Sequence, residues 1–226
     1  MIAHSLNIRL GRLCVHADDS AYYWGLLNGE EQHRAEGINN PQRQAYYIET
    51  YGRLRMLLGE ATDSPPETLR FSKHPHGKPY LVDFPEIAFN LSHTADRIAV
   101  VIGRSCRVGI DIEACKPRTN LAALADKCFG AEEIAYWQAL SETEQFRAFY
   151  HFWTYKEAFV KAVGRGIGLG LHHCVVDPAN PSRMLHVPAS CGPAENWSLH
   201  TLDVGNEVCG AVAVDGPIAA VNMEAF

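Results

Sequence analysis

One short segment, Arg107 to Glu113, restricts the fold more than any other part of this 226-residue chain. Branched aliphatic residues alternate there with glycine or acidic residues, in the order Val108, Gly109, Ile110, Asp111, Ile112 and Glu113. Alternate residues of a β-strand point to opposite faces of its sheet. The segment is therefore predicted to be a strand with one face in a hydrophobic core and with Asp111 and Glu113 together on the other face.

The two acids of this strand allow two interpretations. In the first, the strand lies half-exposed at the edge of a sheet, and water solvates both carboxylates. In the second, a divalent cation joins them, because neighbouring carboxylates on one face repel each other. An all-oxygen ligand set favours Mg²⁺, Mn²⁺ or Ca²⁺ over zinc. A third acid such as Glu157 would suit that site.

The first half of the chain is predicted to contain helices followed by strands. An opening strand at 5–16 precedes a helix at 20–36, in which Asn28 is a candidate N-cap. Pro41 begins a second helix, whose apolar stripe includes Tyr47 and Tyr51. The sequence DSPPE, from Asp63, ends that helix. Strands are then predicted at 79–82, 87–91 and 98–102.

The second half repeats this order. Short helices fit 121–129 and 131–140, and Ser141 with Glu144 forms a capping box for a long helix that ends at Gly164. Strands fit 173–176, 184–187, 197–203 and 208–214. We therefore expect an α+β protein of two similar α/β halves, residues 1–106 and 107–226, which pack tightly without a long linker.

The long helix carries charges among many aromatic residues. At 100° per residue its core side is predicted to hold Phe152, Tyr155, Phe159, Ala162 and Val163. Glu157 and Lys161 lie roughly opposite, one turn apart, as in an ordinary exposed ion pair worth about 0.2–0.5 kcal/mol. Lys156 lies closer to the edge of the core, where a structural role is expected. The glycines after Val163 are interpreted as a helix C-cap and a loop.

Polar residues also cluster before the acidic strand. The turn KHPHGKPYL, residues 73–81, concentrates two lysines and two histidines, and Ser92 and His93 follow a predicted strand. Singly, each is typical of a solvated surface, and no third ligand accompanies the histidines. Together they would supply cations and hydroxyls for phosphate groups.

Composition excludes several other classes of protein. The net charge of −6 argues against general nucleic-acid binding, which needs a basic surface. The seven cysteines are scattered without a CxxC pair, so we expect reduced thiols in a cytoplasmic protein. The N-terminus does not resemble a signal peptide, and no apolar run is long enough to span a membrane.

Four motifs in a fixed order resemble those of the Sfp-type 4′-phosphopantetheinyl transferases. They are GKP, FNLSH, VGIDIE and FWTYKEAFVKAVGRGI, and the likeness covers about residues 40–170. The spacing between the last two motifs is the most specific part. The resemblance implies a fold of two halves related by pseudo-twofold symmetry, with nucleotide bound on the side of residues 1–106 and metal and pyrophosphate on the side of 107–226.

The resemblance also implies an activity. Such an enzyme transfers the 4′-phosphopantetheine arm of coenzyme A to a serine of an apo acyl or peptidyl carrier protein and releases 3′,5′-ADP. Mg²⁺, or alternatively Mn²⁺, would be the cofactor. The carrier would belong to fatty acid, polyketide, nonribosomal peptide or glycolipid synthesis. We expect a cytoplasmic monomer with neither nucleic acid nor membrane as a partner.

Site residues follow from the resemblance motif by motif. Asp111, Glu113 and Glu157 match the metal ligands, and Asp111, Glu157 and Lys161 match the catalytic group. Lys161 also matches a lysine beside the pyrophosphate. The remaining expected contacts to coenzyme A are Gly77, Lys78, Pro79, Ser92, His93 and Arg43.

The chain departs from the family in one place. Lysines often hold the 3′-phosphate from the early helical segment, whereas GEEQHRAEG offers His33 and Arg34 here. Arg43 and His93 are then expected to carry more of that contact. Two other functions stay open: a non-catalytic module that binds coenzyme A or a carrier, and a different Mg²⁺-dependent nucleotide enzyme.

Overall fold

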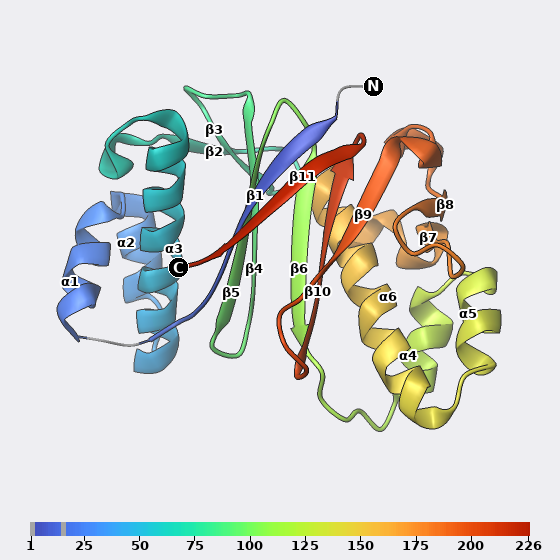
Figure 1. The fold of residues 1–226 in the computed structure, drawn as a ribbon. Coiled ribbons are helices and arrows are strands. Elements are labelled where there is room, and N and C mark those ends of the chain that lie inside the picture. The colour runs from blue at the N-terminus through green and yellow to red at the C-terminus, as the bar shows by residue number, and fades with distance from the viewer. Residues whose placement is uncertain (1–2, 15–16) are drawn as a thin grey trace.

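Two β-sheets form the centre of the molecule in the computed structural model, which describes residues 3–14 and 17–226 (Figure 1). The four-stranded sheet has the order β11-β1-β5-β4, and the three-stranded sheet has the order β6-β10-β9. Their strands are β1 (His4–Arg12), β4 (Ile87–Thr94), β5 (Arg97–Arg104), β6 (Val108–Ala114), β9 (Trp197–Leu202), β10 (Val208–Asp215) and β11 (Ile218–Ala225).

Helices cover the outer sides of the two sheets (Figure 1). On one side lie α1 (Ala17–Leu26), α2 (Gly29–Glu36) and α3 (Pro41–Thr62), and on the other lie α4 (Leu121–Cys128), α5 (Ala131–Gln138) and α6 (Glu142–Val163). Two short hairpins complete the fold, β2 (Phe71–Lys73) with β3 (Pro79–Leu81) and β7 (Val175–Val176) with β8 (Met184–His186). This arrangement confirms the predicted α+β class.

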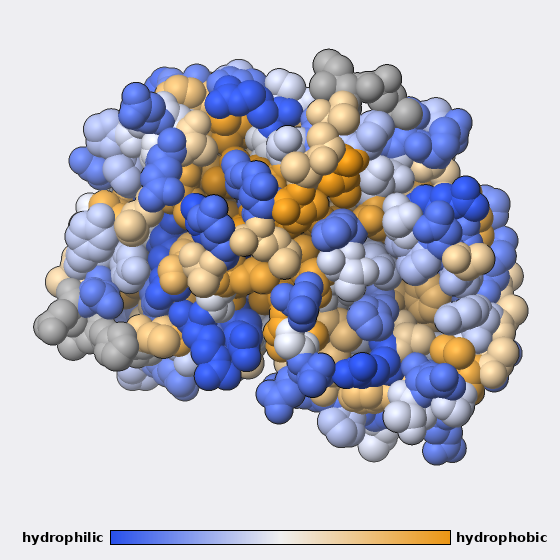
Figure 2. Space-filling model, viewed as in Figure 1, coloured by the Kyte–Doolittle hydropathy of each residue, from blue (hydrophilic) through white to orange (hydrophobic). Residues whose placement is uncertain are grey.

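The distribution of apolar residues on the surface matches this arrangement of central sheets and outer helices. In the view of Figure 2, apolar residues gather in the middle of the face, over the strands, and polar residues dominate the helical flanks. Among the described residues, no helix has both the length and the apolar character needed to cross a membrane.

Capping residues set the helix ends as the sequence predicts. Asn40 accepts a hydrogen bond from the backbone N–H of Arg43, and Pro41 stands in the first turn of α3. The helix ends where Asp63 adopts the left-handed conformation, at φ 51°. At the end of α6, Gly164 has φ 75° and donates its N–H to the carbonyl of Val160. These caps are local features, which explains why the sequence alone located them.

The single helix predicted at 20–36 is wrong, because Asn28 divides it into α1 and α2. Asn28 Oδ1 accepts from the N–H of Glu31, and a carboxylate oxygen of Glu31 accepts from the N–H of Asn28, both at 2.9 Å. This capping box requires an extended backbone at Asn28, whose ψ is 169°. The predicted cap is therefore correct, but it starts a new helix. Residues 15 and 16 of the predicted opening strand lie outside the described residues.

The last strand, β11, was not predicted. It pairs in parallel with β1, from His4 opposite Ile218 to Leu10 opposite Ala225. Because its partner lies more than 200 residues earlier, local pattern gives little sign of the pairing. The end of the chain thus completes the sheet of the first half, while the division into residues 1–106 and 107–226 stays a prediction.

Strand β6 lies between two cores. Its aliphatic face packs against β1 and β5, where Leu6, Val101 and Ile110 are each 0% exposed. Its other face lies against α6 at Ala158 and Ala162, while Phe152 and Phe159 of that helix are buried in a second core. The predicted core side of α6 is confirmed by this packing. The strand is therefore held on both faces, and its position is well determined.

Gly109 allows α6 to approach β6 closely. A Cβ atom at this position would lie 2.1 Å from the carbonyl oxygen of Ala158 and 2.4 Å from the backbone nitrogen of Ala162. Both contacts are to backbone atoms, so no side-chain movement could relieve them. This contact sets the distance between the acidic strand and the helix that bears Glu157 and Lys161.

We predict that Gly109→Ala lowers the free energy of unfolding by at least about 2 kcal/mol, because the methyl group must push the helix off the strand. Gly25→Ala is the control, since no described atom beyond its chain neighbours and the nearby backbone of α1 lies within 4 Å of the added Cβ. That change is expected to be neutral or to stabilise by up to about 1 kcal/mol. Urea unfolding followed by circular dichroism measures both, and equal stabilities would contradict the close approach.

Candidate active site

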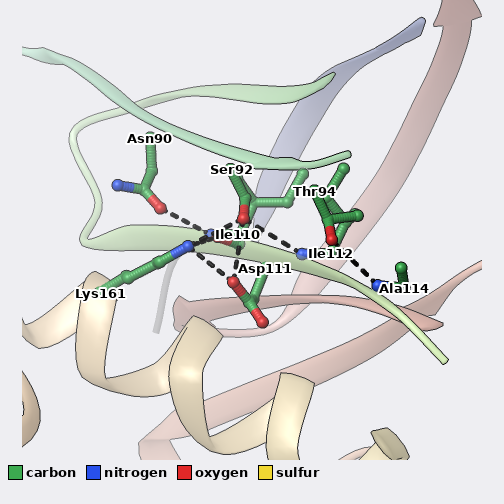
Figure 3. Close-up of polar contacts among 8 residues, drawn as sticks. All are labelled: Asn90, Ser92, Thr94, Ile110, Asp111, Ile112, Ala114 and Lys161. Atoms are coloured by element: carbon green, nitrogen blue, oxygen red, sulfur yellow. Dashed lines mark hydrogen bonds and ion pairs between the residues drawn. The ribbon is translucent and has the colours of Figure 1, made fainter. Parts of the chain in front are cut away.

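The two sheets meet along β4 and β6, which are joined by side chains (Figure 3). Asn90 Oδ1 accepts from the backbone N–H of Ile110 at 2.9 Å, and Ser92 Oγ accepts from that of Ile112 at 3.3 Å. A third bond of the same kind runs from the N–H of Ala114 to Thr94 Oγ1 at 3.1 Å. We call these three contacts the seam. They satisfy one edge of β6, whose other edge forms a regular antiparallel ladder with β10.

Lys161 reaches the seam from α6 (Figure 3). Its ammonium donates to Asp111 Oδ1 at 2.7 Å, to Ser92 Oγ at 3.0 Å and to the carbonyl of Ile110 at 3.2 Å. Ser92 in turn donates its hydroxyl proton to Asp111 Oδ1 at 2.9 Å. Lys161 therefore pairs with the acid of the neighbouring strand, and the interpretation of an ordinary surface pair with Glu157 is wrong.

Asp111 is only 5% exposed, which also excludes the half-exposed edge strand with two solvated acids. Together with Glu113, Glu157 and Lys161 it lines a cavity of about 580 Å³. The rest of the lining comes from α3, β3, β4, β6 and α6, namely Tyr47, Thr50, Tyr51, Pro79, Phe89, Asn90, Leu91, Ser92, His93, Ile112 and Trp153. The cavity thus opens where the two sheets meet, between α3 and α6.

Electrostatics in the cavity favour a bound cation. Burial raises the pKa of Glu157 above its ordinary value, and the charge of Asp111 raises it further. The pKa of Glu113 is raised for the same two reasons. Arg118 and then Lys161 lower the pKa of Glu113, and Lys161 lowers that of Glu157, but burial and Asp111 outweigh them. Three carboxylates around one ammonium leave a local excess of negative charge.

Two buried carboxylate oxygens show where such a cation would fit. Asp111 Oδ2 and Glu157 Oε1 have no hydrogen-bond partner among the described residues. A buried charged oxygen without a partner is costly, and a hard cation would satisfy both. Within residues 3–14 and 17–226, however, no three His, Cys, Asp or Glu side chains are placed to hold a metal together. Asp111 and Glu157 therefore offer oxygens that suit the ion, and a set of three acids with Glu113 would require at least one of these side chains to rotate.

Of the other residues expected to contact coenzyme A, some line the cavity and others do not. Ser92, His93 and Pro79 line the cavity. Gly77 lies in an exposed turn at φ 89°, a left-handed conformation that favours glycine, and it donates its N–H to the carbonyl of His74. Arg43 is exposed near the start of α3 and is not among the lining residues.

Lys78 points away from the cavity in this conformation. Its ammonium donates to the carbonyl of Val108 at 2.8 Å and to that of Ala162 at 2.9 Å. Burial lowers the pKa of Lys78 to about 8. The side chain thus connects the turn of the first half to both β6 and α6.

Lys156 is structural, as its place on the helix predicts. It is fully buried, pairs with Glu133 at 2.6 Å and donates to the carbonyls of Leu171 and Cys174. Glu133 also accepts from the N–H groups of Gly130 and Val176. A buried pair needs such additional hydrogen bonds to offset the loss of hydration. This network holds α5, α6 and the loop after α6 together.

Sequence reasoning missed the wall of the cavity formed by α3. Tyr47 and Tyr51 were assigned to an apolar stripe, yet both line the cavity with Thr50 between them. Tyr47 Oη and Thr50 Oγ1 are buried and have no hydrogen-bond partner among the described residues. The alternation of Asn90, Ser92 and Thr94 along one strand was the available signal for the seam.

Comparisons with known proteins decide the family. The 4′-phosphopantetheinyl transferase superfamily model matches residues 107–213, which include β6 and α6. The 4′-phosphopantetheinyl transferase HetI of Nostoc sp. is 31% identical over 194 residues, which cover 84% of this chain and 79% of HetI. This chain belongs to the 4′-phosphopantetheinyl transferase superfamily.

Two further proteins with this activity in their names are also similar to this chain. The protein slr0495 of Synechocystis sp., whose name carries the same activity, is 32% identical over 179 residues, 78% of this chain and 72% of its own length. The 4′-phosphopantetheinyl transferase Sfp of Bacillus subtilis is 31% identical over 157 residues, 64% of this chain and 69% of Sfp. The resemblance to Sfp-type transferases is thereby confirmed.

We predict that Asn90→Ala lowers the free energy of unfolding by about 1–3 kcal/mol, because the N–H of Ile110 loses its acceptor in a fully buried place. Thr94→Ser is the control, since it keeps a hydroxyl oxygen at the other end of the seam. Its cost is expected to stay within about 1 kcal/mol. Denaturant unfolding compares the two, and an unchanged stability of Asn90→Ala would contradict the role of the seam.

Proposed function

We propose that this chain transfers the 4′-phosphopantetheine arm of coenzyme A to a serine of an apo acyl or peptidyl carrier protein and releases 3′,5′-ADP. The observation that supports this most is the joint placement of Asp111, Glu157 and Lys161 around one cavity in a member of this superfamily. Transfer of a phosphoryl-linked group needs positioning and charge neutralisation more than covalent help from the protein.

The charged residues divide this work. Lys161 is part-exposed toward the cavity, at 29% of its side chain, and would neutralise a pyrophosphate oxygen while Asp111 holds its ammonium in place. Asp111 Oδ2 and Glu157 Oε1 would hold Mg²⁺ or Mn²⁺, with Glu113 as a third ligand after rotation. The bound ion would supply further charge neutralisation on the pyrophosphate.

Glu157 also suits a role as proton acceptor. Burial and the charge of Asp111 raise its pKa, which makes its carboxylate a stronger base than that of an ordinary glutamate. We propose that it accepts the proton of the attacking serine, directly or through a water molecule. The serine oxygen then forms a bond to the β-phosphorus, and the bond from that phosphorus to the bridging oxygen of 3′,5′-ADP breaks.

The wall of α3 is proposed to bind the polar part of coenzyme A. Tyr47 Oη and Thr50 Oγ1 need hydrogen-bond partners, and coenzyme A offers phosphate and ribose oxygens. In this proposal residues 1–106 hold the nucleotide and residues 107–226 the metal and pyrophosphate. His93 and Arg43 would contact phosphate at the margin of the cavity. We further propose a cytoplasmic monomer.

The direct test is a mass measurement on a panel of apo carrier proteins, with coenzyme A and Mg²⁺. We expect at least one carrier to gain the mass of the phosphopantetheine arm, with release of 3′,5′-ADP. Tight binding of coenzyme A without transfer to any carrier would favour the non-catalytic module. A different product from coenzyme A would favour another Mg²⁺-dependent nucleotide enzyme.

In the same assay, Asp111→Ala and Glu157→Ala are each predicted to lower the rate by about 100-fold or more, because each removes charge stabilisation at the reacting phosphate. Glu67→Ala, at an exposed acid before β2, is the control and should keep the rate of the natural chain. Circular dichroism checks that all three variants fold. Folded acid variants with unchanged rates would refute the metal and base assignments.

We predict that Tyr47→Phe raises the KM for coenzyme A about tenfold, the effect of roughly 1.4 kcal/mol, and leaves kcat within about twofold. Tyr46→Phe is the matched control, since the Tyr46 hydroxyl accepts from Gln42 at an exposed place on the same helix. Steady-state kinetics with varied coenzyme A measures both. Equal KM values for the two variants would show that the α3 wall does not contact this substrate.

A further inference from the structure

Two cysteine side chains meet at the end of the acidic strand. Cys115 directly follows β6, and Cys209 lies on β10 in register with Glu113. Their sulfur atoms are 3.1 Å apart. A disulfide needs a sulfur–sulfur distance of about 2.05 Å, so a shift of roughly 1 Å would allow the bond to form.

Strand pairing places both thiols on one face of the sheet. The N–H of Cys115 donates to the carbonyl of Glu207, which extends the β6–β10 ladder by one residue. Cys115 is therefore opposite Glu207 and diagonal to Cys209, and Glu113 lies on the same face, directly opposite Cys209 and two residues before Cys115. This face is the one that packs against α6 and carries the acids.

The two thiols differ in access to solvent. Cys209 is 6% exposed, whereas Cys115 is part-exposed and lies beyond the last residue of β6. A small oxidant in solution would reach Cys115 first.

We propose that Cys115 and Cys209 form a reversible disulfide under oxidants of the peroxide class, and that this bond lowers the transfer activity. The Cys115 thiol takes one oxygen from hydrogen peroxide, becomes a sulfenic acid and releases one water. The Cys209 thiol then attacks that sulfur, loses its proton, and the hydroxyl leaves as a second water. The two thiols lose two electrons and two protons in total, and the peroxide gains them.

The effect on activity depends on Glu113 and therefore rests on the proposed function. Among the described residues no three acids are placed to hold a cation together, and in this proposal Glu113, directly opposite Cys209, is the acid that rotates to join Asp111 and Glu157. A disulfide formed beside it joins the end of β6 to β10 and restricts that movement. The oxidised chain would then hold the cation with two acids where the reduced chain has three.

The test starts with the bond itself. The natural chain is oxidised with hydrogen peroxide, its remaining thiols are alkylated, and its peptides are mapped by mass spectrometry. We expect a cross-linked peptide pair that contains Cys115 and Cys209, lighter by about 2 Da than the two thiol peptides and lost after dithiothreitol. Separate alkylated or over-oxidised peptides of the two cysteines, without the cross-link, would overturn the proposal.

Activity is measured on the same samples. We expect peroxide to lower the transfer rate by about fivefold or more, dithiothreitol to restore it, and Cys115→Ser to change less than about twofold under peroxide. Cys14→Ser is the control, because it removes an exposed thiol far from β6 in sequence and should leave the sensitivity unchanged. A cross-link without loss of rate would overturn the regulatory part.

The two proposals fail in distinguishable ways. A reduced natural chain that modifies no carrier would refute the proposed function, while peptide mapping would still decide whether the disulfide forms. Cys209→Ser would remove the bond as well, but Cys209 is buried and its replacement could prevent folding. Cys115→Ser alone still tests both the formation of the disulfide and its effect on the transfer rate.

Discussion

The seam between β4 and β6 is the interaction on which the rest of the structure depends. These strands belong to different sheets, so no backbone ladder joins them, and the buried N–H groups of Ile110 and Ile112 need other acceptors. Side-chain oxygens on every second residue of β4 supply them. Buried N–H groups without acceptors would be costly, and the seam therefore sets the relative position of the two sheets. It also brings Ser92 beside Asp111, where the candidate site begins.

Helix α6 adds the charged side chains of Glu157 and Lys161 beside this seam. Gly109 lets the helix lie close to the strand, and Lys78 binds carbonyls of both β6 and α6 from the first half of the chain. At that distance Lys161 can bond to Asp111 while Glu157 stays without a partner for one oxygen. The helix thus has one face devoted to the core and another that contributes opposite charges to a single cavity. The excess of acids over cations there is what a bound metal ion would offset.

Strand β6 combines several roles in seven residues. One face lies in the core between the sheets, the other carries the acids, and its end leads to the thiol pair. Core packing, the proposed cation binding and the proposed oxidation of Cys115 and Cys209 would therefore be physically linked. A movement at the end of the strand reaches Glu113 first, because Asp111 is held by Ser92 and Lys161.

Local pattern was enough to predict much of this protein. Alternation placed β6 and its two faces, caps placed the ends of α3 and α6, and the spacing of motifs indicated the superfamily. The angular positions of residues around α6 placed Lys156 near the core and Lys161 on the opposite side, because burial of one helix face repeats with the helical period. The tertiary structure alone decided the parallel pairing of β11 with β1, the seam and the hydroxyl wall of α3. These depend on contacts between residues far apart in the chain, and neither period nor propensity encodes which distant partner a strand or a polar group will find.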